Sequence, residues 1–179
     1  MTKNIKKFPL TFTKQLPYNG GTKWLKVVKN GVFTQGWGAG SVTGEYQHSL
    51  DNKGRLFIPA KLRDELGEVF FITLSMDRCL CAYSSDNWQV LSDKVSAMPY
   101  VKQRKMRPLF AHAARCELDA QGRALIPQSL RAYANLTKNV TVIGCNNHAE
   151  LWDSEAWNAV YAEETTPENI AAVMEELEF

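Results

Sequence analysis

A stretch of sixteen residues occurs twice in this chain, 68 positions apart, and the two copies align without a gap. Eight of the sixteen positions are identical, because Leu50, Asp51, Gly54, Arg55, Ile58, Pro59, Leu62 and Arg63 return as Leu118, Asp119, Gly122, Arg123, Ile126, Pro127, Leu130 and Arg131. A weaker similarity follows at an offset of 69, between residues 82–88 and 151–157. Such a repeat predicts two tandem copies of one structural module.

Each copy has the pattern of two strands, a short helix and two further strands. Residues 45–50 and 55–58 read as strands, and Gly54 between them adopts positive φ readily, which predicts a hairpin. Pro59 suits the first turn of a helix over 60–66. Residues 69–74 and 79–83 predict a second hairpin, and Ser85 is expected to cap the helix that follows. The second copy predicts strands at 115–118, 123–126, 140–144 and 149–152 and helices at 128–133 and 154–161.

These modules predict one α+β domain, because a unit of about 45 residues buries too little apolar surface to fold alone. We expect two βαββ modules, at 45–89 and 115–158, to pack together with pseudo-two-fold symmetry. A linking helix over 98–114 joins them, and Pro108 predicts that this helix is kinked or split. The acidic tail at 162–179 is expected to be a short amphipathic helix or a solvated extension.

The formal net charge of +2 conceals three blocks of different charge. Residues 1–44 hold seven lysines and no acid, residues 45–161 are nearly balanced, and residues 162–179 hold six glutamates and no base. No apolar run approaches the length of a membrane span, so we expect a cytoplasmic protein without membrane contact. The cysteines form no C-x-x-C pair, and Cys79 and Cys81 are expected to be small buried apolar residues, so no metal site is predicted.

The doubled pattern resembles the MraZ family of bacterial transcription regulators, which consist of two AbrB-like swapped-hairpin modules. The D-x-x-x-R signature of that family matches twice, at residues 51–55 and 119–123. The resemblance covers about residues 44–161. It implies a repressor that binds short tandem DNA repeats upstream of the division and cell wall gene cluster, including its own gene. It also implies a ring-shaped homo-oligomer associated with the nucleoid, with neither a cofactor nor a small-molecule substrate.

The residues of the two turns are the candidate DNA contacts. We expect Arg55 at a hairpin tip to fork onto guanine O6 and N7, with Lys53 neutralising a phosphate and Asn52 beside them. Arg123 and Gln121 are the counterparts in the second copy. Arg63 and Arg131 are weaker candidates, which contact DNA, pair with Asp64 or Glu65, or pack their stems. We expect four residues to shape and orient the turns: Asp51, Gly54, Asp119 and Gly122. The aspartates are not expected to touch DNA, because a carboxylate near phosphates is repelled.

Residues 1–43 are an atypical basic extension, which we expect to be disordered, and two interpretations stay open. The segment is either a basic arm that follows DNA, with Trp24 and Trp37 among its lysines, or the product of a misplaced start site. In the second case Val42 is encoded by GTG and starts the chain. Back-translation of residues 23–31 then allows TGG triplets ten nucleotides apart, so that the extension is a translated operator.

Two other classes of function compete with DNA binding. An enzyme could use Asp51, Asp119, His48, His112 and His148 as acids and bases, but no nucleophile elbow, phosphate loop or metal-ligand spacing accompanies them. A protein-interaction scaffold is the stronger rival, because related folds serve in antitoxins and assemblies, and fold alone does not decide function. The nearly neutral core, with a net charge of +1, implies that one subunit binds DNA weakly and that a ring binds cooperatively.

Overall fold

The computed structural model of the chain describes residues 12–18, 21–27, 33–35 and 42–177. It divides into two compact units, residues 1–40 and 41–179. The first unit contains a small antiparallel sheet of three strands in the order β1-β2-β3: β1 (Phe12–Tyr18), β2 (Gly21–Val27) and β3 (Phe33–Gln35). Whether this segment acts as an arm on DNA or is a translated operator stays a prediction.

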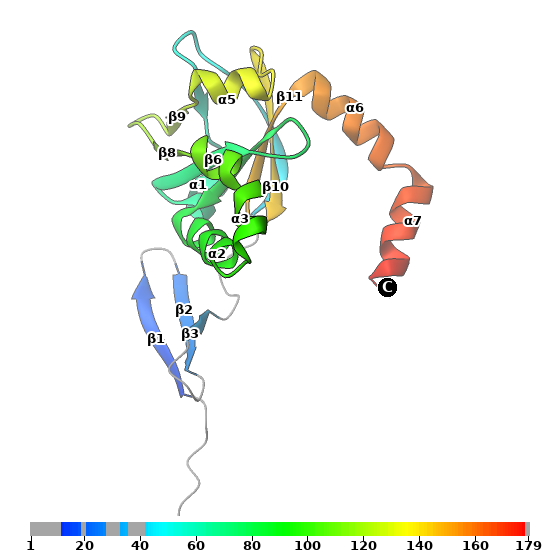
Figure 1. Cartoon of the computed structure of the whole chain (residues 1–179). Helices are drawn as coiled ribbons and strands as arrows, with labels where there is room; N and C mark the ends of the chain where they lie inside the picture. The colour runs from blue at the N-terminus through cyan, green and yellow to red at the C-terminus, as the bar shows by residue number, and fades with distance from the viewer. Residues whose placement is uncertain (1–11, 19–20, 28–32, 36–41, 178–179) are drawn as a thin grey trace, which may run out of the picture. The chain divides into compact units, whose positions relative to one another are not determined.

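The second unit holds the two copies of the module, and they contain the same elements in the same order (Figure 1). The first copy comprises β4 (Val42–Ser49), β5 (Arg55–Phe57), α1 (Ala60–Leu66), β6 (Val69–Leu74), β7 (Leu80–Ser84) and α2 (Ser85–Ser96). The second comprises β8 (Ala114–Glu117), β9 (Arg123–Leu125), α5 (Gln128–Tyr133), β10 (Asn139–Asn146), β11 (Ala149–Asp153) and α6 (Ser154–Glu164). The expected mixed α+β fold of two modules is therefore confirmed.

Six of these strands form one antiparallel sheet in the order β4-β10-β11-β7-β6-β8. Replacing each strand by its counterpart in the other copy gives the same order read backwards, which is pseudo-two-fold symmetry. The first strand of each copy pairs with a strand of the other copy: β4 pairs with β10, and β8 pairs with β6. At the centre β7 pairs with β11, with Cys81 opposite Glu150.

The first predicted hairpin is not formed as a ladder between its own two strands, so that prediction was wrong. β5 pairs instead with β9 of the other copy, with Leu56 opposite Ala124. Both of these side chains are fully buried. The exchange therefore buries the middle of each short strand against the other copy, which a local hairpin would not do. The second predicted hairpin, β6 with β7, is confirmed.

The main core lies where the two copies meet. Six of its side chains are almost inaccessible to solvent and come in matching positions of the two copies: Leu56, Ile58, Leu62, Ala124, Ile126 and Leu130. Burial of each large aliphatic side chain contributes about 1.5–3 kcal/mol. A smaller cluster of Cys79, Ile143 and Trp152 is packed against Trp157 and Val160 of α6. The interface between the copies is thus part of the main core and contributes to the stability of the second unit.

The linking segment is split into α3 (Tyr100–Lys105) and α4 (Arg107–Ala111), and Pro108 lies in the first turn of α4. This is the split that Pro108 predicted, since proline has no N–H to continue a helix. The Thr73 hydroxyl donates to the Leu109 carbonyl at 2.5 Å and so ties α4 to β6. In α2 the cap is Ser84 rather than Ser85, because the Ser84 hydroxyl accepts from the Asn87 N–H at 3.2 Å.

Of the two forms expected for the acidic tail, the structure has the helix. The helix α7 (Pro167–Glu176) is capped by Thr166, whose hydroxyl accepts from the Asn169 N–H at 3.2 Å. Every residue of α7 is exposed. Within the described ranges no helix combines the length and the apolar character that crossing a bilayer requires.

Candidate nucleic-acid interface

The two D-x-x-x-R turns have the same local structure. In the first turn one oxygen of Asp51 accepts from the backbone N–H of Lys53 and of Arg55, both at 2.9 Å. In the second, Asp119 accepts from the N–H of Gln121 at 2.9 Å and of Arg123 at 3.0 Å. The spacing of aspartate and arginine therefore closes a tight turn and leaves the intervening residues at its tip.

The antiparallel pairing of β5 with β9 brings the two turns together and joins their charges in one cluster. The other oxygen of Asp51 accepts from Arg55 Nε at 2.7 Å, and that of Asp119 accepts from Arg123 Nε at 2.9 Å. Across the copies, Arg55 Nη1 lies 3.6 Å from Asp119 and Arg123 Nη1 lies 3.7 Å from Asp51. We call these four residues the charge cluster, and each of their side chains is 28–30% exposed.

The charge cluster holds both carboxylates in the ionised form. The pKa of Asp51 is lowered to about 2, first by the hydrogen bond from the Arg55 backbone and then by that from its side chain. The pKa of Asp119 is also lowered to about 2, first by the Arg123 side chain and then by its backbone. Two cations and two anions face one another, so the cluster as a whole carries no net charge.

Gly54 and Gly122 allow an arginine of the other copy to lie against each turn. Gly54 has φ +77°, and a Cβ built there would lie 2.7 Å from Cζ of Arg131. Gly122 has φ +74°, and its Cβ would lie 2.5 Å from Nη1 of Arg63. Positive φ and the approach of a guanidinium both require glycine at these positions.

Arg63 and Arg131 therefore pack rather than pair with neighbouring acids. The Arg63 guanidinium lies 5.3 Å from the centre of the Phe57 ring, and Arg131 Nε donates to the Ile126 carbonyl at 3.0 Å. Of the three roles expected for these arginines, packing of the stem is the one that the contacts favour.

Arg55 was expected at the tip of the first turn, but in the structure it lies behind that tip. It is the first residue of β5, with Nε and Nη2 both on Asp51, and its guanidinium is not free to fork onto a base without leaving these contacts. Asn52 and Lys53 form the exposed tip instead. In the second turn the exposed residues are Ala120 and Gln121, and Arg123 Nη2 donates to Gln121 Oε1 at 2.9 Å. The contacts agree with the orienting role expected for Asp51.

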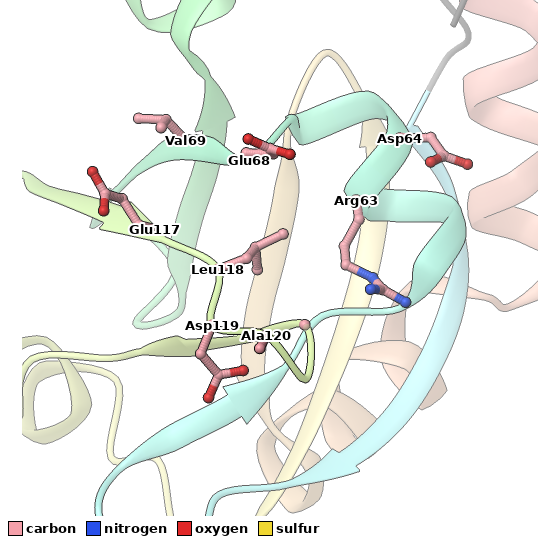
Figure 2. Close-up of a pocket in the computed structure, with 9 residues that line it drawn as sticks. Arg63, Asp64, Glu68, Val69, Glu117, Leu118, Asp119 and Ala120 are labelled. Carbon is pink, nitrogen blue, oxygen red and sulfur yellow. The ribbon is translucent and has the colours of Figure 1, made fainter. Parts of the chain in front are cut away.

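A shallow groove runs beside the second turn, between α1 and β8 (Figure 2). Its lining carries four carboxylates, on Asp64, Glu68, Glu117 and Asp119. Arg63 reaches from α1 toward the turn in this view (Figure 2). Glu117 is paired with Arg115 and Asp119 with Arg123, which leaves Asp64 and Glu68 as the acids of this lining that repel phosphates. The exposed tips are therefore the better candidate contact surface.

The linking segment contains a group of cations that the sequence reading did not single out. No acidic residue lies in the linking segment, residues 98–114, whereas four basic residues do: Lys102, Arg104, Lys105 and Arg107. Lys102, Arg104, Lys105 and Arg107 are exposed on α3 and α4. The absence of acids over this stretch was the available signal, and averaging charge over residues 45–161 concealed it.

The acids and bases proposed for an enzyme lie in separate contacts within residues 42–177. The His48 ring lies 5.1 Å from that of Phe57, and burial lowers the pKa of His48. His148 pairs with Glu150, with 3.3 Å between Nε2 and Oε1, while both aspartates are held by arginines. No contact in this part of the chain joins a histidine to Asp51 or Asp119.

Comparison with known proteins identifies the family. A family model of MraZ proteins, described as antitoxin-like, matches residues 42–107 and 109–177. Each match covers one copy of the module, and together they cover well over half of the chain. The family is one of regulators rather than of enzymes. The chain therefore belongs to the MraZ family.

Proposed function

We propose that this protein is a sequence-specific DNA-binding transcriptional regulator. It represses the division and cell wall gene cluster, including its own gene, from tandem repeats on the nucleoid. The observation that carries the proposal is the pair of matching turns, whose tips are exposed while the charge cluster fixes their bases. A rigid pair of tips loses little conformational freedom on binding, which favours recognition of a fixed DNA geometry.

The tip of the first turn offers more groups for contact with DNA than the tip of the second. Lys53 neutralises a phosphate, and its ammonium has no ion-pair partner among residues 42–177. The amides of Asn52 and Gln121 suit hydrogen bonds to base edges or phosphates. Arg55 contributes the N–H groups that its carboxylates leave unused, since a guanidinium has five donors. We therefore expect the first turn to contribute more to DNA binding than the second.

One subunit offers few free cations, so repeated display is needed for tight binding. The charge cluster is neutral, and each phosphate contact contributes to an affinity that falls with salt. A ring of subunits presents many identical turns to repeats about 10 bp apart, which makes later contacts intramolecular. The exposed cations of α3 and α4 add attraction for the DNA backbone.

Fluorescence anisotropy with labelled DNA tests this proposal. The wild-type protein should bind the region upstream of its own gene in preference to a scrambled duplex, with strong salt dependence. Lys53→Ala should weaken binding to every sequence and lower the salt slope by about 1 per contacting subunit. Arg55→Lys keeps the charge but removes the guanidinium N–H groups that Asp51 leaves unused, and should cost about 1 kcal/mol of discrimination between sequences.

Lys94→Ala, on α2 and outside both turns, is the matched control and should bind like the wild type. Equal affinity of the wild type for the scrambled duplex would contradict sequence-specific binding. A monomeric mass in solution would contradict the ring. If Lys94→Ala weakened binding as much as Lys53→Ala, the turns would not be the contact surface.

A protein-interaction scaffold is the second candidate, and α7 favours it. Four apolar side chains of this region are 43–59% exposed: Ile170, Val173, Met174 and Leu177. Exposed apolar side chains on an acidic helix suit contact with another protein surface. The scaffold predicts that the wild type binds no DNA at all, whereas the regulator uses such contacts only between subunits.

A further inference from the structure

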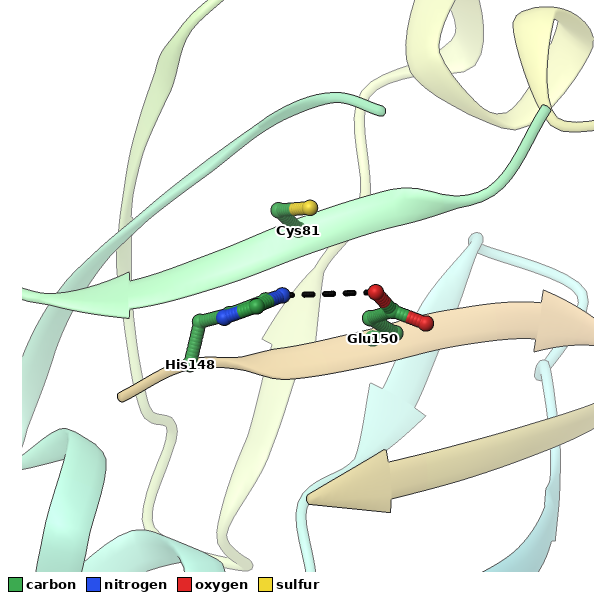
Figure 3. A group of neighbouring side chains, drawn as sticks. All are labelled: Cys81, His148 and Glu150. Carbon is green, nitrogen blue, oxygen red and sulfur yellow. Dashed lines mark hydrogen bonds and ion pairs between the residues drawn. The ribbon is translucent and has the colours of Figure 1, made fainter. Parts of the chain in front are cut away.

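A second cluster of polar side chains lies at the centre of the large sheet, where β7 of the first copy meets β11 of the second. Cys81 stands opposite Glu150 in this ladder, and His148 precedes β11. Figure 3 shows Cys81 beside the hydrogen-bonded pair of His148 and Glu150. None of these side chains belongs to the turns of the nucleic-acid interface.

We propose that Cys81, His148 and Glu150 form a binding site for Zn²⁺. One ligand atom from each residue lies within 4.8 Å of the other two. Thiolate, imidazole and carboxylate are the three ligand types that zinc takes in proteins, at bond lengths of about 2.0–2.3 Å. Tetrahedral coordination sets ligand atoms about 3.5 Å apart, so a small inward movement of these side chains supplies three of the four positions and leaves the fourth to a water molecule or a flanking thiol.

Hydrogen bonds to the outer atoms orient two of the three ligands. His148 Nδ1 lies 2.8 Å from Asn147 Oδ1, and Trp152 Nε1 donates to Glu150 Oε2 at 2.8 Å. With Nδ1–H donated to the amide, the lone pair of Nε2 faces Glu150 Oε1 at 3.3 Å. Two lone pairs that face each other need a positive charge between them, either a proton or a metal ion. Outer hydrogen bonds of this kind are typical of metal-binding histidines.

The surroundings combine an apolar wall with access for an ion. Ile143 and Trp152 line the same side of the sheet and are buried. Cys81 is 7% exposed, whereas the side chains of His148 and Glu150 are 19% and 17% exposed. The Cys145 thiol interacts with Glu150, and the Cys79 thiol interacts with that of Cys81, so further sulfur donors flank the three ligands.

The ion would join the two modules. One ligand comes from β7 of the first copy and two come from the hairpin of β11 in the second, so zinc would bridge the central seam of the sheet. Its role is structural, because metal bound in the folded state but not in the unfolded chain stabilises the fold. This inference does not depend on DNA binding.

The test uses the full chain, kept reduced and freed of metal with a chelator. Zinc is titrated against a chromophoric chelator, and native mass spectrometry counts the ions. We expect one Zn²⁺ per chain and a higher melting temperature on its addition. Asn147→Ala should weaken zinc binding by about 10–100-fold. Co²⁺ in place of zinc should give a thiolate-to-metal charge-transfer band in the near ultraviolet.

Cys81→Ser should abolish the Co²⁺ band and most zinc binding. Cys116→Ser is the matched control, because Cys116 is equally buried but lies in the main core. If Cys81→Ser does not fold, His148→Gln should weaken binding while the charge-transfer band persists at saturating Co²⁺. Failure of the wild type to bind zinc would show that a proton alone lies between His148 and Glu150 and would overturn the proposal. Equal loss of zinc in Cys116→Ser would overturn it as well.

Discussion

Replacing Gly54 with alanine tests how far the first turn depends on contact with the other copy. At φ +77° a methyl group at this position would lie 2.7 Å from Arg131 Cζ and 2.9 Å from Arg131 Nε. The guanidinium would have to leave the turn, and with it the 3.0 Å hydrogen bond from Arg131 Nε to the Ile126 carbonyl. The substitution therefore adds backbone strain, displaces Arg131 from the first turn and breaks a hydrogen bond within the second copy.

The expected loss of stability follows from these two effects. A side chain at a left-handed backbone position costs about 1–2 kcal/mol. A hydrogen bond from a charged group contributes about 1.5–3 kcal/mol, and the lower end applies because Arg131 is partly exposed. Gly54→Ala should therefore lower the free energy of unfolding by about 3 kcal/mol.

Gly67→Ala is a control for backbone strain without a nearby side chain. Gly67 has φ +81°, but the nearest atom to a Cβ there is the Val69 carbonyl oxygen at 3.9 Å. At φ 81° and ψ 178° its backbone is nearly restricted to glycine, so strain alone should cost this variant about 1–3 kcal/mol. Gly122→Ala should lose about 2 kcal/mol, less than Gly54→Ala. Displacing Arg63 removes its contact with the Phe57 ring, but Arg63 Nε has no hydrogen bond to lose.

Urea unfolding followed by tryptophan fluorescence measures these differences. All variants are compared at one protein concentration, because subunit association adds to apparent stability. The double variant Gly54→Ala/Arg131→Ala should lose less than the sum of its single changes, since the methyl group then has no guanidinium to displace. A double variant whose loss equals the sum of the two single losses would refute the proposed support of the turn by Arg131.

Three further outcomes are expected. The pKa of Asp51 and Asp119 is about 2 in the folded chain against an ordinary 3.8, so the stability that they contribute is full above about pH 4 and is lost as pH falls towards 2. Asp51→Asn/Asp119→Asn should flatten the dependence of the unfolding free energy on pH in urea titrations, and an unchanged dependence would contradict this assignment. Leu56→Ala, in the core, should cost about 2–5 kcal/mol, whereas Leu125→Ala, at a 57% exposed position, should cost under about 0.5 kcal/mol; equal costs would contradict the assigned packing. Replacing Lys102, Arg104 and Lys105 with glutamine should lower the salt slope of DNA binding by about 0.9 for each lysine or arginine that contacts a phosphate, and an unchanged slope would exclude α3 from the interface.

Local structure was predictable from the sequence because its determinants are local. The helix expected over 60–66 matches α1, since Pro59 sets its start and Gly67 follows its end. The split of the linking helix followed from Pro108 in the same way. The pairing of β5 was not predictable from residues 45–58, because its partner β9 lies in the other copy and a three-residue strand has little pattern of its own.

The candidate site shows the same division between local and distant determinants. The pairing of Asp51 with Arg55 follows from their spacing and the turn between them. The approach of Arg55 to Asp119 and the packing of Arg63 on Gly122 depend on how the copies exchange strands, and neither alternation nor spacing reports that exchange. This is why the sequence placed Arg55 at an exposed tip, whereas the structure encloses it in a charge cluster.

The same symmetry explains why a thiol can face a carboxylate at the centre of the sheet. The offset of 69 that relates the two copies carries Cys81 onto Glu150, and these two residues are direct partners in the ladder of β7 and β11. The pseudo-two-fold axis therefore passes between them. A symmetric dimer of one module would place the same residue on both sides of this axis, and two ionised carboxylates there would repel each other. Two copies joined in one chain can carry different residues at the axis, so joining the modules allows a thiol, an imidazole and a carboxylate to meet there.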